Sequence, residues 1–212
     1  MKRTNKVLIV LLIAALSYLF YTHTKKVGEQ ISSAFDVPDR YTQTAMAADI
    51  VVLDFNNYSC DHCQKMHPVL KEAIERDNRV RYIPRTVSWG EGNEWGKILV
   101  AAPYAAGEQG KFIEMHNAIY ENLPIDDLTK LISVAKKIGL DTKEFSRDIS
   151  RSEIKSWSDK NFQLFKDWGI NRTPTLMIGP ANNAGRAKIY RPKDGTPTVD
   201  DLLEQFEKAR NR

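Results

Sequence analysis

The 212-residue sequence predicts an α/β domain with an inserted all-helical segment, and three patterns lead to that prediction. A continuous apolar run at residues 50–53 is typical of a strand buried on both faces of a sheet. Residues 94–168 carry apolar positions at helical spacing, with breaks at glycine and proline. Residues 175–179 and 187–190 then have the pattern of a β-hairpin. The predicted order is therefore βαβ, a helical block, and ββα.

The remaining elements have local signals of their own. A helix begins near Cys60, and its apolar positions recur at helical spacing through Ile74. Residues 79–82 alternate basic and apolar side chains, which indicates a second strand, and a proline follows shortly after. The last helix begins at Thr198-Val199-Asp200-Asp201, which resembles a capping box. From these elements we expect the α/β domain at residues 49–92 and 170–212, with the helical insertion at 93–169.

Composition and charge exclude several classes of protein. With 42% hydrophobic residues, 11 glycines and 9 prolines, the chain is neither collagen-like nor disordered. The formal net charge of +4 comes from the first 26 residues, which hold five basic residues and no acid, so the rest has 26 basic and 27 acidic residues. Because no basic domain remains, we expect no nucleic-acid partner.

An apolar segment lies close to the N-terminus. Residues 7–21 contain one residue that is not apolar, Ser17, and three basic residues precede them. This pattern is typical of a signal peptide or of a signal anchor. A helix of that length spans about 22 Å, less than a hydrocarbon core of about 30 Å, which favours a signal peptide. Against cleavage, the small triplet Ala15-Leu16-Ser17 is followed by bulky aromatic and apolar residues.

We therefore favour an uncleaved anchor at residues 7–21, with Tyr18 and Tyr21 as interfacial residues. Residues 1–6 are then expected to be a cytoplasmic tail, because a six-residue tail stays easily in the cytoplasm while the rest is exported. Residues 22–212 are then expected on the periplasmic side of the inner membrane of a bacterium, or free in the periplasm if the segment is cleaved. Disulfides persist in that compartment.

Residues 22–48 are mostly polar and precede the first predicted strand. A sparse apolar set fits one short helix before a proline, formed by Val27, Ile31, Ala34 and Phe35. We expect a stalk next to the membrane, and a short oligomerising helix is the alternative.

Both cysteines fall in the sequence Cys60-Asp61-His62-Cys63, between a buried strand and a helix. Backbone N–H groups and the helix dipole at that position stabilise a thiolate at Cys60, which is the reactive form in thiol–disulfide exchange. Cys63, one turn further along, is expected to be shielded and to attack a mixed disulfide on Cys60. His62 favours the Cys60 thiolate and Asp61 disfavours it.

Two other uses of the pair stay open at this point. A structural disulfide would close a very small loop and contribute little stability. A metal site of Cys60, Cys63 and His67, with His62 nearby, lacks the second ligand pair of a structural zinc site, and copper handling is its stronger form. His67 alone is better explained as a surface or packing residue of the helix. We expect redox use of the pair, with no cofactor and no metal.

Two features elsewhere in the sequence support redox use. Asp54 lies in the apolar strand run, where burial should raise the pKa of a carboxyl group, and it can point toward Cys63 and relay its proton. A turn-forming aspartate is the alternative. Arg172-Thr173-Pro174-Thr175 precedes the hairpin, where an X-Pro bond can be cis. If this loop packs against the pair, the backbone of Thr173 can pair with an extended substrate segment.

Together these residues resemble the thioredoxin-fold oxidoreductases of the DsbA type, over roughly residues 49–212. The resemblance rests on the helical insertion and on three motifs, which are Asp54-Phe55, Tyr58-Ser59-Cys60-Asp61-His62-Cys63 and Gly169-Ile170-Asn171-Arg172-Thr173-Pro174-Thr175. It implies a thioredoxin-like fold with the insertion, here preceded by a membrane segment. It also implies that Cys60 is the exposed nucleophile, that Cys63 resolves, that Asp54 is buried near the pair, and that the Thr173-Pro174 peptide is cis beside the disulfide.

The sequence departs from the family pattern at two positions. The family usually has proline directly after the first cysteine, where this chain has Asp61, and small residues before the Thr-Pro, where this chain has Arg172. Asp61 should make the pair less oxidising, and Arg172 partly offsets that if it reaches the site. The direction of electron flow is therefore not set by the motifs.

The expected function is thiol–disulfide exchange on exported proteins with cysteines, most simply their oxidation through a mixed disulfide on Cys60. The resemblance then implies a quinone-linked membrane partner that reoxidises the pair. An isomerase or reductase, kept reduced by a membrane electron donor, is the alternative, although such proteins usually oligomerise and residues 22–48 are short for a dimerisation domain. A copper-binding dithiol protein is the third hypothesis, and it gives no role to Asp54 or to Thr173-Pro174.

Overall fold

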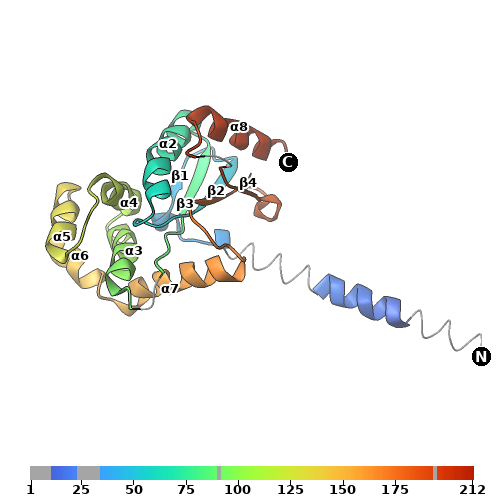
Figure 1. The fold of residues 1–212 in the computed structure, drawn as a ribbon, viewed down its shortest axis with the longest axis horizontal. Helices are drawn as coiled ribbons and strands as arrows, with labels where there is room; N and C mark the ends of the chain where they lie inside the picture. The colour runs from blue at the N-terminus through green and yellow to red at the C-terminus, as the bar shows by residue number, and fades with distance from the viewer. Residues whose placement is uncertain (1–10, 23–33, 90–91, 193–194) are drawn as a thin grey trace, which may run out of the picture. The chain divides into compact units, whose positions relative to one another are not determined.

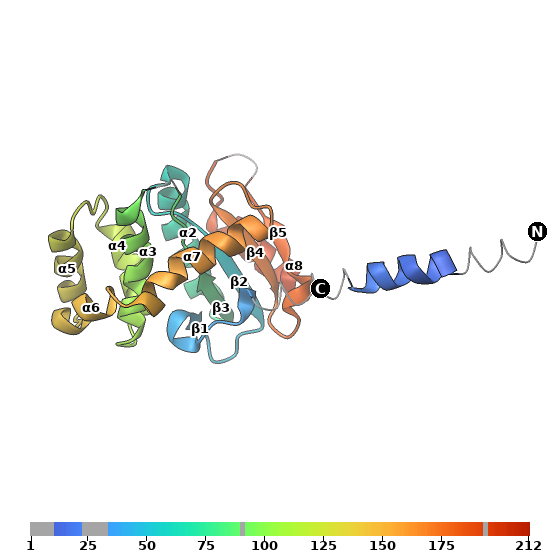
Figure 2. The same cartoon turned by 90° about the horizontal axis from the view of Figure 1, so that it is seen from below.

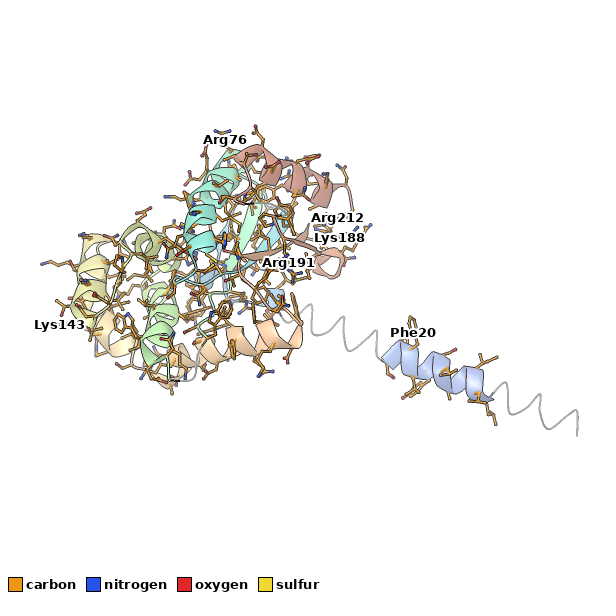
Figure 3. The ribbon with its side chains drawn as sticks, viewed as in Figure 1. Phe20, Arg76, Lys143, Lys188, Arg191 and Arg212 are labelled. Carbon is orange, nitrogen blue, oxygen red and sulfur yellow. The ribbon has the colours of Figure 1, made fainter. Side chains whose placement is uncertain are left out.

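The structure, a computed structural model, describes residues 11–22, 34–89, 92–192 and 195–212. The chain divides into two units, Met1–Asp36 and Val37–Arg212. In the first unit, residues 11–22 form a helix with exposed apolar side chains, among them Phe20 (Figure 3). The predicted tail at 1–6 and the start of the predicted anchor at 7–10 lie outside the described residues.

Over the described ranges, no helix combines the length and the apolar character needed to cross a membrane.

In the second unit, the described strands form one sheet of order β1-β3-β2-β4-β5 (Figure 1). The central strand is the predicted apolar run, and all six of its residues are buried, as expected for a strand covered on both faces. It pairs in parallel with β3 and antiparallel with β4, while β1 and β5 are antiparallel edge strands. The strands are β1 (Gln43–Thr44), β2 (Ile50–Phe55), β3 (Val80–Pro84), β4 (Thr175–Pro180) and β5 (Lys188–Tyr190).

Helices cover both faces of this sheet. Helices α2 (Asp61–Asp77) and α8 (Val199–Arg210) lie on one face, and α7 (Ser152–Asp167) lies on the other (Figure 1). On the first face, alternate strand residues pack with apolar residues of both helices, including Ile50, Val52, Leu70, Leu202 and Phe206. On the second face, the Phe55 ring lies 5.9 Å between centroids from the rings of Phe165 and Trp168. The sheet is thus buried between two layers of helix.

The inserted segment consists of helices that pack on one another beside the sheet. They are α3 (Glu94–Gly107), α4 (Phe112–Glu121), α5 (Leu128–Lys137) and α6 (Thr142–Asp148), followed by α7. Helix α7 runs from this segment across the sheet (Figure 2). Its buried Asn161 donates to the Thr86 carbonyl at 2.9 Å and accepts from the Arg85 guanidinium at 3.2 Å. These bonds attach the insertion to the chain that leaves β3.

The segment just before β2 corrects the expected stalk at residues 22–48. Strand β1 pairs with β3, and a 3-10 helix, η1 (Asp39–Tyr41), packs on α3. Tyr41 is buried against Tyr104, with ring centroids 5.1 Å apart, and a Cβ at Gly107 would lie only 2.7 Å from the Tyr41 ring. Because this aromatic side chain fills a site in the folded unit, that unit begins at Val37 and not at residue 49. Residues 23–33, including Val27 and Ile31 of the predicted short helix, lie outside the described residues.

The predicted order of elements is confirmed: βαβ, a helical block, then ββα. The capping box at the start of α8 is present as well. The Thr198 hydroxyl accepts from the Asp201 N–H at 3.1 Å, and the Asp201 carboxylate accepts from the Thr198 N–H at 2.8 Å.

Candidate redox site

The two cysteines lie at the start of α2 and differ in exposure. Cys60 is the N-cap residue, and its Sγ accepts a hydrogen bond from the Cys63 N–H at 3.4 Å. Cys60 is half-buried, whereas Cys63 is 2% exposed, and both are free thiols. Burial raises the pKa of the Cys63 thiol, and the charge of Asp54 raises it further. The pair therefore has one accessible thiol and one that is buried and protonated.

The loop before β4 lies against Cys60. The Thr173-Pro174 peptide bond is cis, and the Cys60 thiol donates to the Thr173 carbonyl with sulfur and oxygen 3.6 Å apart. The Thr175 hydroxyl donates to the Arg172 carbonyl at 2.8 Å and accepts from Arg191 Nε at 3.1 Å. Thr175 begins β4 opposite the last residue of β2, so the pairing of these two strands brings the loop and the cysteines together.

Asp54 lies inside the sheet and is 3% exposed. Its Oδ2 accepts hydrogen bonds from the Tyr82 hydroxyl and from Asn56 Nδ2, each at 2.9 Å. Its Oδ1 is buried, and among the described residues it has no hydrogen-bond partner. Burial raises the pKa of Asp54 to about 6, and the bonds from Tyr82 and Asn56 act in the opposite direction. Asp54 therefore gains and loses a proton near neutral pH.

A buried histidine of α4 extends the contacts of Asp54. His116 is fully buried, with Nε2 3.3 Å from the Tyr82 hydroxyl and Nδ1 2.9 Å from the Tyr58 hydroxyl. Burial lowers the pKa of His116 well below its usual value, so the ring is neutral and has one donor nitrogen and one acceptor nitrogen. While Asp54 is ionised, Tyr82 gives its only proton to Asp54, so it accepts from His116 Nε2–H, and Nδ1 accepts from Tyr58. This assignment yields a continuous chain of hydrogen bonds from Tyr58 to Asp54.

A second arm of this network reaches α2. The Tyr120 hydroxyl donates to Asn56 Oδ1 at 3.1 Å, and the Tyr120 ring stacks on the ring of His67 with centroids 4.1 Å apart. His67 is 8% exposed, and burial lowers its pKa to about 4. The prediction that His67 is a packing residue is confirmed.

No motif in the sequence assigns Asn56, Tyr82, His116 or Tyr120 to the site. A usable signal for His116 was present, because it lies at helical spacing from Phe112 and Ile119 and is the polar member of a buried face. Nothing in the local pattern of β3 distinguishes Tyr82 from an ordinary core tyrosine, and its role depends on the pairing of β3 with β2.

The remaining predicted site residues lie around the exposed cysteine. Asp61 and His62 are the first two residues of α2, and both are exposed. A cavity of about 350 Å³ is lined by His62, Arg172, Thr173 and Pro174, among others, and Asp61 is not among the lining residues. The structure thus brings His62 and Arg172 to the same surface as the Thr173-Pro174 peptide.

The arrangement suits electron transfer between two thiols and a disulfide. Chemically, an accessible sulfur at a helix N-terminus can act as a nucleophile, a buried second sulfur can act as a resolving thiol, and a carboxyl group with a pKa of about 6 can exchange a proton. In the part of the chain that the structure describes, no three His, Cys, Asp or Glu side chains come together as a set of metal ligands.

Comparisons with known proteins agree with this fold. The family model described as Thioredoxin matches residues 36–190, most of the chain. The Na(+)/H(+) antiporter NhaA 1 of Salinispora arenicola is 24% identical over 155 residues, which are 72% of this chain and 24% of the antiporter. This chain therefore spans about a quarter of the length of the curated relatives that it matches.

Solved structures share the fold at low sequence identity. A thioredoxin-like oxidoreductase from Silicibacter pomeroyi has a TM-score of 0.66 and 21% identity, over 83% of this chain and 99% of that one. The thiol-disulfide exchange protein alpha-DsbA2 from Wolbachia pipientis has a TM-score of 0.66 and 18% identity, over 88% of this chain and 97% of that one. The family match shows that the chain belongs to the thioredoxin family, and the solved structures share its fold.

Proposed function

We propose that the protein introduces disulfides into exported proteins through the Cys60–Cys63 pair. The observation that carries the proposal is the contrast between the two thiols. Cys60 is half-buried at the N-cap of α2, whereas Cys63 is buried and its pKa is raised by burial and by the charge of Asp54, a carboxyl group with a pKa of about 6. An oxidase needs this asymmetry, because the accessible sulfur must meet a protein substrate and the buried sulfur must leave and return without contacting it.

In the proposed reaction, a substrate thiolate attacks Cys60 Sγ of the oxidised pair. The Cys60–Cys63 bond breaks, a substrate–Cys60 disulfide forms, and Cys63 leaves with the electron pair and takes a proton. A second substrate thiolate then attacks the substrate sulfur of the mixed disulfide and releases Cys60 as a thiolate, which accepts the Cys63 N–H bond. Two electrons pass from the substrate to the pair, and one substrate disulfide is formed.

Asp54 is proposed to supply and accept the Cys63 proton. Its pKa of about 6 lets it hold a proton or release one near neutral pH, whereas the raised pKa of Cys63 requires a proton whenever that sulfur leaves the disulfide. The Thr173-Pro174 loop is proposed to hold the substrate in an extended form, since Thr173 already contacts the reactive sulfur.

The direction and the compartment are part of the same proposal. The basic residues and the apolar segment at the N-terminus support export, with residues 7–21 as an inner-membrane anchor, and a quinone-linked membrane protein is proposed to reoxidise the pair. The pairing of β1 with β3 supports an oxidase over an oligomeric isomerase, because η1 and β1 belong to the folded unit and shorten the segment available for dimerisation.

The reduction potential of the pair, measured by equilibration with glutathione, tests the direction. We expect a value between about −120 and −180 mV, typical of oxidants, and a value near about −270 mV would assign the protein to the reductases. Replacing Cys63→Ser should trap substrates on Cys60 as mixed disulfides in cells, while the Cys60→Ser variant serves as the control that traps none. If the Cys63→Ser variant captured no exported protein, the proposed exchange would be refuted.

A further inference from the structure

The cavity beside Cys60 carries two arginine side chains from different loops. Arg172 precedes the cis peptide, and Arg191 directly follows β5 and is labelled in Figure 3. Both line the same cavity of about 350 Å³, together with His62 and apolar surface from Met66 and Pro174. Two guanidinium groups and a histidine therefore border one hollow next to the reactive sulfur.

Within the described ranges, neither arginine is in an ion pair. Arg172 is exposed and its side chain makes no hydrogen bond there, while Arg191 uses Nε to donate to the Thr175 hydroxyl. Most other arginines of the folded unit behave differently: Arg40, Arg76, Arg79, Arg81, Arg147, Arg151 and Arg210 each pair with a carboxylate. No aspartate or glutamate is among the lining residues of the cavity. Lys193 and Asp194, which carry opposite charges, lie outside the described residues.

The cavity lies within reach of a substrate segment bound at Cys60. Thr173 and Pro174 form part of its wall, and the Thr173 carbonyl is 3.6 Å from Cys60 Sγ. An extended chain advances about 3.3 Å per residue, so a side chain one or two positions from the reacting cysteine enters the hollow. A carboxylate there would contact the guanidinium groups of Arg172 and Arg191, and the methylene groups of a glutamate side chain would pack on the apolar wall of the cavity.

We propose that Arg172 and Arg191 select substrate segments that carry an acidic side chain within two residues of the reacting cysteine. This inference deepens the proposed oxidation of exported proteins and rests on it. Arg191 also has a structural contact, because its Nε donates a hydrogen bond to Thr175, the first residue of β4. The Arg172 side chain has no such contact among the described residues, and the bond from Thr175 to its backbone carbonyl survives substitution, so replacing Arg172 isolates the loss of charge.

The test compares pairs of reduced two-cysteine peptides that differ only in glutamate or glutamine beside the reacting cysteine. The oxidised full-length protein is mixed with each peptide, and the second-order rate of peptide oxidation is measured at low and high salt. The same peptides are treated with bis(2-hydroxyethyl) disulfide, a neutral reagent, so that the effect of the glutamate on its own thiol is divided out. We expect a corrected glutamate-to-glutamine ratio of roughly three to ten, which falls as salt screens the contact.

Substitutions of the two arginines test whether they cause the preference for the glutamate peptide. Arg172→Gln is expected to lower the ratio toward one, and Arg191→Lys, which keeps the charge, should retain most of it. Arg186→Gln is the matched control, since Arg186 is an exposed arginine in η2 (Ala184–Arg186), beyond the far end of β4, and its loss should leave the ratio unchanged.

A corrected ratio of one in the unmodified protein would overturn the selectivity, and so would a ratio that Arg172→Gln leaves intact. Failure of the proposed oxidation would look different, because the glutamine peptide would then remain reduced as well.

Discussion

Two aspartates at opposite ends of β2 differ in the groups that surround their carboxyl oxygens. Asp49, just before the strand, accepts from Arg210 Nε at 2.9 Å and pairs with Arg79 at 3.0 Å, and Arg210 also binds Asp77. Asp54, five residues on, has two neutral donors on one oxygen and no partner among the described residues on the other. The first carboxylate is held by Arg210 of α8 and by Arg79, which directly precedes β3, and the second is buried among uncharged groups.

The two aspartates therefore differ in protonation: Asp49 stays ionised in its ion pairs, whereas Asp54 can exchange a proton. A carboxylate met by arginine stays ionised and links the elements that carry the charges, here α8, α2 and the start of β2. A carboxyl group buried without a cation costs stability when it ionises, and that cost is what raises the pKa of Asp54 to about 6. Ionisation of Asp54 therefore lowers the stability of the fold, whereas ionisation of Asp49 does not carry that cost.

The largest expected effect is on stability at the Asp54 end. The pKa of Asp54 is about 6 in the folded protein, against an ordinary value of 3.8 in the unfolded chain. Between about pH 4 and pH 6 the folded state therefore keeps a proton on Asp54 that the unfolded state has lost. The free energy of unfolding falls as the pH rises through that range. Over that range the loss is about 3 kcal/mol, at 1.36 kcal/mol per pKa unit.

Asp54→Asn removes this loss. Urea unfolding of the reduced protein should therefore show the variant more stable by up to about 3 kcal/mol at pH 8, with the two proteins equal near pH 3.5. Equality at low pH controls for shape, because aspartic acid and asparagine are then both neutral. A variant that is less stable than the parent at pH 8 would contradict the assignment.

The next effect concerns the exchange rate. If Asp54 supplies the proton that Cys63 takes up as it leaves the disulfide, Asp54→Asn should slow disulfide exchange with a reduced test protein by about 100-fold, the lower range for a positioned acid or base. The parent rate should also depend on pH with a midpoint near 6, and the variant should lack that midpoint. Stopped-flow fluorescence over a pH series measures both. A variant profile with the same midpoint would show that another group titrates.

The opposite result is expected at the Asp49 end. Arg210→Gln leaves Asp49 and Asp77 without their shared partner, and we expect a loss of about 2 kcal/mol in unfolding free energy, since Asp77 is 7% exposed and Asp49 is 38% exposed. Exchange activity of the folded protein should stay unchanged. Arg76→Gln provides the control, because Arg76 and its partner Glu72 are both about half exposed, and its loss should cost well under 1 kcal/mol.

The smallest effect tests the network around Asp54. Tyr82→Phe removes the hydroxyl that donates to Asp54, and this donor lowers the pKa of the carboxyl group. The midpoint in the rate profile should therefore rise by about 0.7 pH unit, equivalent to about 1 kcal/mol for one hydrogen bond. The Tyr58 hydroxyl bonds to His116 and not to Asp54, so Tyr58→Phe should shift the midpoint much less. Equal shifts in the two variants would mean that the proton position on His116 controls Asp54.

Much of the fold was predictable because local patterns and tertiary packing agree. The apolar run of β2, the hairpin of β4 and β5, and the capping box at Thr198 each have a short-range physical cause, and each element formed where it was expected. The segment from Val37 to Thr44 lies within the polar stretch at residues 22–48, for which the sequence predicts a stalk. Its place in the sheet depends on Tyr41 filling a site on α3, a contact with residues far along the chain.

The sequence by itself determined the chemistry that this protein offers: two cysteines three residues apart at a helix start, an aspartate in an apolar strand, and a Thr-Pro before a hairpin. Local spacing is enough to predict these features, because the signals for helix starts and strand ends lie in a few consecutive residues. Only the tertiary structure decided which groups surround Asp54 and Cys60. His116, Tyr82 and Arg191 come from separate elements, and strand pairing and helix packing, which no local pattern encodes, bring them to the site.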